Sequence, residues 1–446
     1  MDTKAQLQAI NSAKSDHLAA RLLTCSPLSN SVLRNFLSQQ CPSPPDGTPT
    51  PCSAPRKGDT WYYPSELAND LKDVDISEDD KAELIATAWE AMRSIIPTST
   101  SWERYLAITR LYIIFYFAEF HGKTIDVLAG DNILGYSVSS LVDIVFQGTS
   151  ICEEMAREFR CMLLIVAEKA SDRRNGEFFR RFANSLAQSP AQWFRMRDRD
   201  GLMRFSLMAA LACNDVLDEG FSQEQLEILS EMVFIMYDAV AFYKHRSEGE
   251  ICNTFAYMPA DLRAKAFRQY REVYWALDVA WARRPSLMFV PNFLRMYGGS
   301  AYMMMRRYRF VEDDLTIGMP ETEEIGSQAR SNVKLWYRAD ANKIKDVSEE
   351  SYQRYKDILD RREELLFPGL DAILETADER LCETCLYPDS YGAEAPIHCF
   401  GGVQLCDKCG AEWRDFLESF PDRAAKAFPE LVEIYNEGIT SKRVVE

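Results

Sequence analysis

The stretch SQEQLEILSEMVFIMYDAVAFYKHRSEGE, residues 222–250, decides the fold class. Ser222 and Gln225 have the three-residue spacing of a capping box, in which each side chain bonds the other residue's backbone N–H at the start of a helix. The apolar residues that follow keep the three- and four-residue spacing of one helical face: Leu226, Leu229, Val233, Met236 and Val240. The stretch therefore predicts a long amphipathic helix.

Helix-starting signals of the same kind recur along most of the chain. Ser77 and Asp80 precede one helical pattern, and Ser189 with Pro190 precedes another. Alternating strand patterns are scarce, and only 20 of the 446 residues are glycine. We therefore predict three parts: a disordered, Pro- and Ser-rich leader over residues 1–57, an all-α domain over residues 58–375, and a zinc-binding module with C-terminal helices over residues 376–446.

The chain carries a net charge of −17, which disfavours binding to nucleic acid or to acidic membranes. Its most apolar run, LYIIFYFAEF at residues 111–120, is about half as long as a membrane span requires. The first residues lack the apolar core of a signal peptide. We expect a cytoplasmic protein that acts on a small molecule, with no stable membrane insertion and no nucleic-acid partner.

Two Cys-x-x-Cys pairs lie near the C-terminus, separated by twenty residues: Cys382 with Cys385, and Cys406 with Cys409. Each pair presents two sulfurs from one tight turn, and two such turns complete the tetrahedral four-thiolate site typical of structural Zn²⁺. His398 and Cys399, between the pairs, are substitute ligands, and two disulfides or free thiols are the alternative. Four thiolates leave no open coordination position, so a zinc ion here is structural and not catalytic.

Carboxylates and a histidine mark candidate metal sites in the helical region. Asp238, His245 and Glu248 fall on one face of the quoted helix, where they can hold a metal or form its solvent-facing side. Glu119 follows the aromatic run LYIIFYFA, so its carboxylate needs a cation, either a metal ion or a salt-bridge partner. Asp126 lies seven residues further on.

Two arginine clusters are candidate phosphate sites. The first contains Arg195, Arg197 and Arg199, and the second contains Arg306, Arg307 and Arg309 with Tyr308. Guanidinium groups bind phosphate oxygens through paired hydrogen bonds, and a tyrosine hydroxyl adds a donor. Surface ion-pair networks are the alternative in so acidic a protein.

The order of these features resembles that of the class I terpene cyclases: an acidic motif, a diphosphate-binding arginine, a second acidic motif and an Arg-Tyr pair. When the quoted stretch is aligned with the second motif, other residues stand at its three metal-binding positions, namely Tyr237, Ala241 and His245. Either the metal is held by Asp238, Glu248 and Glu250, or the segment keeps only phosphate contacts, through Lys244 and His245.

Several idiosyncratic stretches extend the resemblance: DTWYYP (59–64), KASDRRNGE (169–177), LAQSPAQWFRMRD (186–198), TFAYMPADLR (254–263), MMRRYRFVE (304–312) and FGGVQLC (400–406). With them, residues 60–440 are very similar to the fungal α-ionylideneethane synthase family, the unusual sesquiterpene cyclases of abscisic acid biosynthesis. The resemblance implies a class I terpene cyclase-like helical bundle and a Mg²⁺-dependent reaction of farnesyl diphosphate. The first choice of product is α-ionylideneethane, and another sesquiterpene is the second.

The resemblance also implies roles for individual residues. The diphosphate would be bound by Arg197, Lys244, Arg307 and Tyr308. The Mg²⁺ ligands would be Glu119, Asp126, Asp238 and Glu248. The catalytic residues would be Glu119, Asp238 and His245. The aromatic candidates for lining a carbocation cavity, each equally suited to an ordinary core, are Phe115, Trp193, Phe194, Phe242, Tyr243 and Trp275.

The alternative function is a non-catalytic helical interaction protein that docks through its zinc module. A cyclase requires Arg197, Lys244 and Arg307 to surround one apolar cavity, with Glu119 and Asp238 opposite them, whereas a scaffold has no such requirement.

Overall fold

Helix α10 (Gln223–Val240) confirms the helix predicted for the first part of the quoted stretch, but it ends at Val240, so His245 does not continue the face of Asp238 on the same helix as expected. The computed structural model describes residues 61–242, 245, 250–258, 262–282, 284–299, 349–388 and 403–443. The backbone N–H of Gln225 donates to the hydroxyl of Ser222, and the backbone N–H of Ser222 donates to the side chain of Gln225, so the capping box is complete. The predicted apolar face is buried at Leu226, Leu229 and Val233.

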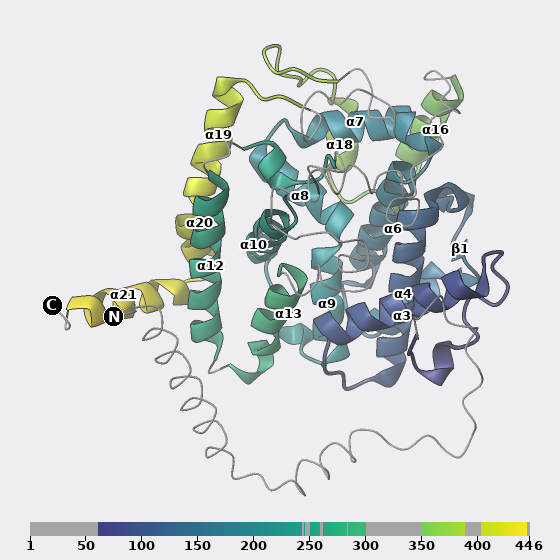
Figure 1. The fold of residues 1–446 in the computed structure, drawn as a ribbon, viewed down its shortest axis with the longest axis horizontal. Helices are drawn as coiled ribbons and strands as arrows, with labels where there is room; N and C mark the ends of the chain where they lie inside the picture. Colours follow the sequence, from purple (N-terminus) through teal and green to yellow (C-terminus); the bar gives the residue numbers. More distant parts are fainter. Residues whose placement is uncertain are drawn as a thin grey trace, which may run out of the picture. The chain divides into compact units, whose positions relative to one another are not determined.

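Among the described residues, helices account for nearly all of the regular structure, which confirms the all-α prediction (Figure 1). Besides α10, the α-helices are α3 (Glu78–Ile95), α4 (Trp102–His121), α5 (Val138–Phe146), α6 (Cys152–Lys169), α7 (Glu177–Leu186), α8 (Pro190–Gly201), α9 (Met203–Cys213), α12 (Leu262–Trp281), α13 (Phe289–Tyr297), α16 (Glu349–Asp360), α17 (Arg362–Leu365), α18 (Leu370–Glu375), α19 (Asp407–Glu418), α20 (Phe420–Ala427) and α21 (Glu430–Arg443). The 3₁₀ helices are η1 (Ser65–Leu67), η2 (Gly122–Thr124), η3 (Val127–Ala129), η4 (Asp172–Asn175), η5 (Leu217–Glu219), η6 (Thr254–Ala256) and η7 (Pro285–Leu287).

A two-stranded hairpin is the only sheet in the described part of the chain. Strand β1 (Asn132–Ile133) pairs antiparallel with β2 (Tyr136–Ser137). The two residues between the strands, Leu134 and Gly135, have φ values of 56° and 82°. Positive φ at both positions is typical of the type I′ turn, which matches the twist of paired strands.

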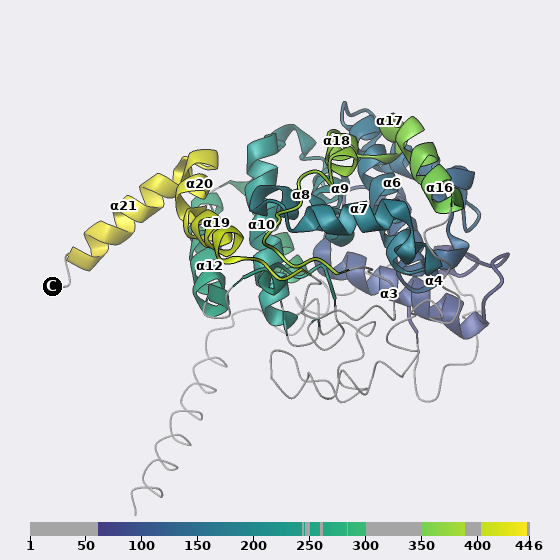
Figure 2. The same ribbon diagram turned by 90° about the horizontal axis from the view of Figure 1, so that it is seen from above.

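Helices α6 and α10 each contact several neighbours and so organise the packing. Helix α10 packs against α8, α12, α13 and α20, whereas α6 packs against α4, α5, α8 and α17. Figure 2 shows α16, α17 and α18 gathered beside α6 and α7. Helix α8 contacts both α6 and α10, so its side chains are positioned by both groups of helices.

The middle of α4 and all of α9 lie in the core. Every residue of α4 from 111 to 118 is buried, and so is every residue of α9. Burial of a large apolar side chain stabilises a fold by about 1.5–3 kcal/mol. These helices therefore form a rigid base for the polar groups described below.

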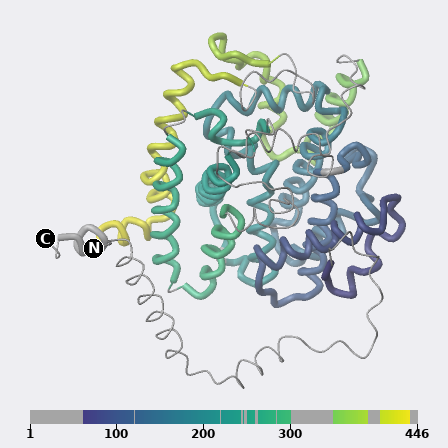
Figure 3. The backbone as a smooth tube through the Cα atoms, in the orientation of Figure 1, coloured from purple at the N-terminus to yellow at the C-terminus, as the bar shows by residue number. Residues whose placement is uncertain are grey.

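The C-terminal helices α19, α20 and α21, yellow in Figure 3, all contact α12. Phe420 of α20 stacks on Tyr270 of α12, with ring centroids 3.7 Å apart. Arg423 of α20 forms an ion pair with buried Glu231 of α10. The boundary at residue 375 stays a prediction, and the leader predicted over residues 1–57 lies outside the described residues.

Each helix among the described residues is either too short or too polar to cross a lipid bilayer.

Candidate functional site

Helix α8 presents its arginines to two different neighbours. It begins at Pro190 after Ser189, as predicted, and ends where Leu202 adopts a left-handed conformation. Arg195 and Arg199 are one turn apart and both pair with Glu158 of α6. Since each helical residue turns about 100°, Arg197 points to the opposite side.

Arg197 is held by two carboxylates in the interior, where it is only 3% exposed. Its Nη2 lies 2.9 Å from Oδ1 of Asp238, and its Nη1 lies 2.8 Å from Oδ2 of Asp200. The guanidinium carbon also lies 4.8 Å from the ring centroid of Phe234. Burial alone would lower the pKa of Arg197, but the two carboxylates outweigh it and raise the pKa well above its usual value.

Asp238 of α10 joins three elements through one carboxylate. It is fully buried, and its Oδ2 accepts hydrogen bonds from both the backbone N–H and the hydroxyl of Thr254, each at 2.7 Å. Burial raises the pKa of Asp238, although Arg197 and Thr254 oppose that rise. Because its Oδ2 already accepts two hydrogen bonds, Asp238 can bind a metal ion only through the remaining lone pair of Oδ1 or after one of these donors is displaced.

His245 lies beside the same carboxylate, bonded to Asn253. The Nδ2 of Asn253 is 2.9 Å from Nδ1 of His245 and donates to the backbone carbonyl of Asp238. The Oδ1 of Asn253 accepts from the N–H of Phe255, so its amide orientation is determined. Asn253 is therefore the donor and Nδ1 of His245 the acceptor, which places the proton of neutral His245 on Nε2.

Lys169 of α6 adds a second cation to the network formed by Arg197, Asp200 and Asp238. Its ammonium pairs with Asp200 and lies 3.5 Å from Glu250. Burial would raise the pKa of Glu250, but the charge of Lys169 lowers it well below its usual range. The charges joined by these bonds are two cations and three carboxylates, which sum to −1.

Three predicted site residues, Arg197, Asp238 and His245, therefore lie together. Asp126 caps η3 by accepting from the N–H of Leu128 and pairs with Arg354 of α16. Glu119 is partly buried in the last turn of α4. Metal binding by either acid stays a prediction. Four other predicted site residues lie outside the described residues: Lys244, Glu248, Arg307 and Tyr308.

The four predicted zinc ligands converge. The sulfur atoms of Cys382, Cys385, Cys406 and Cys409 all lie within 4.8 Å of one another. The Sγ atoms of Cys382 and Cys406 are 3.8 Å apart, too far for a disulfide and close to the edge of a tetrahedron with Zn–S bonds of about 2.3 Å. Within the described ranges, no other group of three or more His, Cys, Asp or Glu side chains converges in this way.

Backbone pairing sets the two Cys-x-x-Cys turns side by side. Leu386 and Gln404 exchange two hydrogen bonds of 2.9 Å, one residue after the first pair and two before the second. The N–H groups of Thr384 and Cys385 lower the pKa of Cys382 to about 6, whereas burial raises the pKa of Cys385 and Cys409. A bound metal would therefore have to supply the charge that keeps all four sulfurs deprotonated. The residues present therefore fit a structural zinc ion.

The chain is similar to known proteins over most of its length. A family model described as "Alpha-ionylideneethane synthase aba3" matches residues 59–430. The chain is 53% identical over 373 residues to alpha-ionylideneethane synthase aba3 of Botryotinia fuckeliana (strain B05.10), with 84% of each chain covered. It is 54% identical over 377 residues to alpha-ionylideneethane synthase abl3 of Leptosphaeria maculans, with 84% of this chain and 87% of the relative covered. The corresponding protein of Pyricularia oryzae is 46% identical over 437 residues, with 85% of this chain and 84% of the relative covered.

The chain belongs to the alpha-ionylideneethane synthase family.

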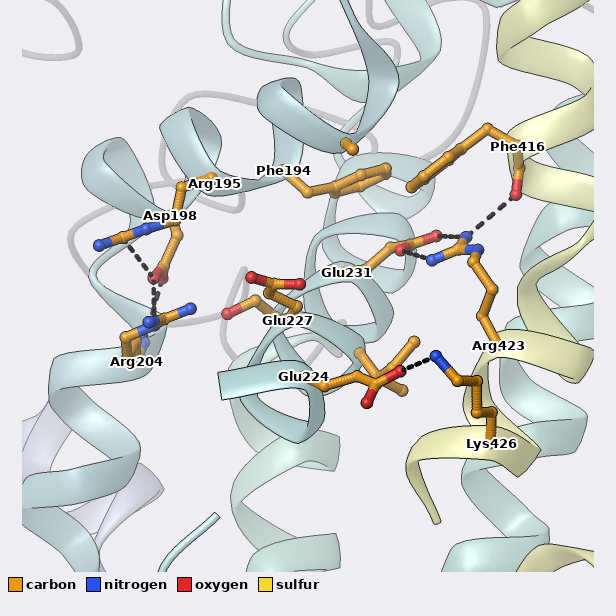
Figure 4. A pocket seen from close by; sticks show the side chains of 13 residues that line it. Phe194, Arg195, Asp198, Arg204, Glu224, Glu227, Glu231, Phe416, Arg423 and Lys426 are labelled. Atoms are coloured by element: carbon orange, nitrogen blue, oxygen red, sulfur yellow. Dashed lines mark hydrogen bonds and ion pairs between the residues drawn. The ribbon is translucent and has the colours of Figure 1, made fainter. Parts of the chain in front are cut away.

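In this family member the second face of α8 borders a separate cavity of about 280 Å³, shown in Figure 4. Phe194 of α8 and Phe416 of α19 form one wall. The charged groups around it are largely paired with one another: Arg423 with Glu231, Lys426 with Glu224, and Arg204 with Asp198. Arg195 and Arg199 were expected to form one phosphate cluster with Arg197. They lie instead on the opposite side of α8, where both pair with Glu158.

Sequence reasoning missed several residues of the Arg197 network in this alpha-ionylideneethane synthase family member. Asp200 was detectable, because it lies one turn after Arg197 on the same helix. Lys169, Asn253 and Thr254 carry no recognisable spacing, since tertiary packing brings them in from other elements. Trp275, expected among the cavity-lining aromatics, lies on the surface of α12 with 51% exposure.

Proposed function

We propose that this protein is a sesquiterpene cyclase that converts farnesyl diphosphate to α-ionylideneethane. The observation that carries the proposal is the buried Arg197–Asp238 pair between α8 and α10. These residues occupy the positions at which the class I cyclase pattern has a diphosphate-binding arginine and a second acidic motif. The printed names of relatives at 46 to 54% identity support the choice of product.

The first chemical step breaks the bond between the allylic carbon and a diphosphate oxygen, and both bonding electrons leave with diphosphate. Negative charge therefore grows on the leaving group, and a cation held in a water-poor site stabilises that charge. Arg197 suits this task because a guanidinium pairs with two phosphate oxygens at once. Diphosphate oxygens would join or replace Asp200 or Asp238 as its partners.

The charge of the network implies that further cations take part. Its bonded groups already sum to −1, so a diphosphate entering without cations would meet net repulsion. Lys244, Arg307 and Tyr308 remain our proposed additional diphosphate ligands. Mg²⁺ is the proposed catalytic metal, and when bound it would neutralise diphosphate charge. No cluster of three carboxylates converges among the described residues.

His245 is better suited to donate a hydrogen bond than to remove a proton. Its Nδ1 accepts from Asn253, which leaves an N–H at Nε2 in the neutral ring. We therefore assign His245 to hydrogen bonding with diphosphate. The proton that ends the reaction then passes to another base, and the released diphosphate is a suitable one.

The test is incubation of purified protein with farnesyl diphosphate, with and without Mg²⁺, followed by gas chromatography–mass spectrometry of an organic overlay. We expect a Mg²⁺-dependent C15 hydrocarbon that co-elutes with α-ionylideneethane. Arg197→Lys should abolish most of the product, since lysine cannot keep the paired geometry. Arg195→Lys is the matched control on the opposite face of α8, and it should retain activity per folded molecule.

A different C15 hydrocarbon would keep the cyclase and overturn the product assignment. Absence of any hydrocarbon from farnesyl, geranyl and geranylgeranyl diphosphates would overturn the enzyme proposal and support the helical interaction protein. Equal losses in Arg197→Lys and Arg195→Lys would reject Arg197 as the diphosphate ligand.

A further inference from the structure

We infer that Trp413, in the zinc-binding segment, is a positioning residue that sets the geometry of Asp238 and Arg197 through a chain of aromatic and hydroxyl contacts. The inference rests on the proposed function, because it names the part of the molecule that holds the proposed diphosphate site in place. It gives the zinc module a role in the reaction without contact with substrate.

The first link is between the metal site and Trp413. Helix α19 begins at Asp407, directly after Cys406, and Cys409 lies in its first turn. Trp413 follows Cys409 by four residues, so the two side chains share one face of the helix. A metal bound by Cys406 and Cys409 fixes the start of α19 and thereby the place of Trp413.

The second link is an aromatic trio. The ring of Trp413 stacks on Tyr257 at 5.7 Å, and its centroid lies 6.0 Å from that of Trp193. Trp193 and Tyr257 are themselves 4.7 Å apart. Trp413 is 1% exposed, and its indole N–H has no acceptor among the described residues. Its contribution is therefore the contact surface of its ring, not a hydrogen bond.

The third link connects the aromatic trio to Asp238 through Thr254. The indole N–H of Trp193 donates to the hydroxyl of Thr254 at 3.0 Å, and that hydroxyl donates to Asp238 at 2.7 Å. The Trp193 bond engages the hydroxyl oxygen as acceptor and so leaves its proton for Asp238. Asp238 in turn holds Arg197. Movement of Trp193 would therefore weaken a donor to the carboxylate that orients Arg197.

A cavity adjoins Tyr257 and the start of α19. The cavity has a volume of about 430 Å³ and is lined by Tyr257 and Met258 at the end of η6 and by Cys406 and Arg414 at the second Cys-x-x-Cys turn. Loss of the Trp413 side chain would enlarge empty space beside Tyr257 and Trp193, and partial collapse into such space shifts the surrounding groups.

The experiment is a double-mutant cycle with Trp413→Leu and Thr254→Val, read as kcat and KM per folded molecule. Misplaced catalytic geometry lowers turnover, so we expect Trp413→Leu to reduce kcat about tenfold or more. Because both residues act on Asp238 through one hydroxyl, Trp413→Leu should reduce kcat less than about twofold further in the Thr254→Val background. Trp413→Phe, which keeps an aromatic ring, should retain most of the wild-type kcat.

Phe420→Leu is the matched control. Phe420 is an equally buried ring of the C-terminal helices, but it stacks on Tyr270 and has no contact with Thr254. This variant should lower stability while kcat per folded molecule stays within about twofold of wild type. Zinc content is measured for every variant, and it should remain at the wild-type value.

Additive losses in the double variant, an equal loss of kcat in Phe420→Leu, or loss of zinc from Trp413→Leu would each overturn the inference. The free energy of unfolding in urea is also measured for the wild type, the two single variants and the double variant, and this measurement needs no substrate. Thus, if the wild type failed to turn over farnesyl diphosphate, the proposed function would fail, while coupling between Trp413 and Thr254 would still be measured.

Discussion

The guanidinium of Arg197 on α8 donates to the carboxylate of Asp238 on α10 across 2.9 Å, in a place where neither side chain reaches solvent. Each ion has lost most of its hydration, so each depends on the other and on Asp200 or Thr254 to compensate. The pair therefore connects two helices of the core and also presents the guanidinium proposed to receive diphosphate.

Removal of one partner of this pair should be strongly destabilising. Asp238→Ala leaves Arg197 with a single carboxylate and both donors of Thr254 without an acceptor. Breaking a buried ion pair in this way typically costs about 3–5 kcal/mol of unfolding free energy. Urea unfolding followed by circular dichroism measures the loss. The double variant Arg197→Met with Asp238→Leu should recover part of this stability, because it removes both buried charges, yet it should remain inactive.

The control is the exposed pair of Lys265 with Glu418, whose side chains are 54% and 41% exposed. Glu418→Ala should leave the unfolding free energy nearly unchanged, since water solvates both charges. A similar loss in Glu418→Ala and Asp238→Ala would contradict the importance assigned to burial.

Gly201 occupies a position where any side chain would disturb Arg197. A Cβ atom added there would lie 2.3 Å from Cε1 of Phe234, whose ring packs against the Arg197 guanidinium. Gly201→Ala should therefore cost about 1–3 kcal/mol through overpacking and should also lower kcat. Gly410→Ala in α19 is the comparison, because its Cβ would meet nothing within 4 Å. Helix propensity makes that change neutral or stabilising by up to about 1 kcal/mol. If both variants behaved alike, steric crowding at Phe234 would not be the cause.

The part of this architecture that sequence predicts is local. The capping box at Ser222 and the start of α8 at Pro190 depend on neighbouring residues, and both appear as expected. The opposite directions of Arg195 and Arg197 also follow from helical periodicity. The bond between Asp238 and Thr254 cannot be predicted from helical periodicity, because it depends on the path that the chain takes after α10. The sequence also does not show whether a tryptophan on an amphipathic helix faces the core or the solvent. Trp275, expected to line a cavity, is half-exposed.

Asp131 should make stability depend on pH in the acid range. Burial would raise its pKa, but hydrogen bonds from Ser139 and Ser137 and the ion pair with Arg160 outweigh burial and lower the pKa to about 2. The folded state therefore binds this proton less readily than the unfolded state, in which the pKa is near 3.8. Its stabilisation is complete above that value and is lost as the pH falls toward 2. Asp131→Asn should be less stable than wild type at neutral pH, and the difference should vanish near pH 2.

Urea midpoints measured across this range check the prediction. Ser139→Ala removes one donor and should give an intermediate effect, since the backbone N–H of Ser139 still bonds Asp131. A difference between wild type and Asp131→Asn that did not change with pH would argue against titration of Asp131.

Zinc should be an integral part of the folded protein. The four sulfurs already have near-tetrahedral separations, and metal ligation would tie the turn after α18 to the start of α19. Elemental analysis should find one zinc ion in the wild-type protein and none in Cys409→Ser, whose unfolding temperature should also fall. Cys152→Ser is the control, because Cys152 lies outside the cluster and bonds Asp143 instead. Retention of zinc by Cys409→Ser would show that another set of ligands holds the metal. A wild-type mass lowered by two hydrogens for each cysteine pair would show disulfides in place of the metal site.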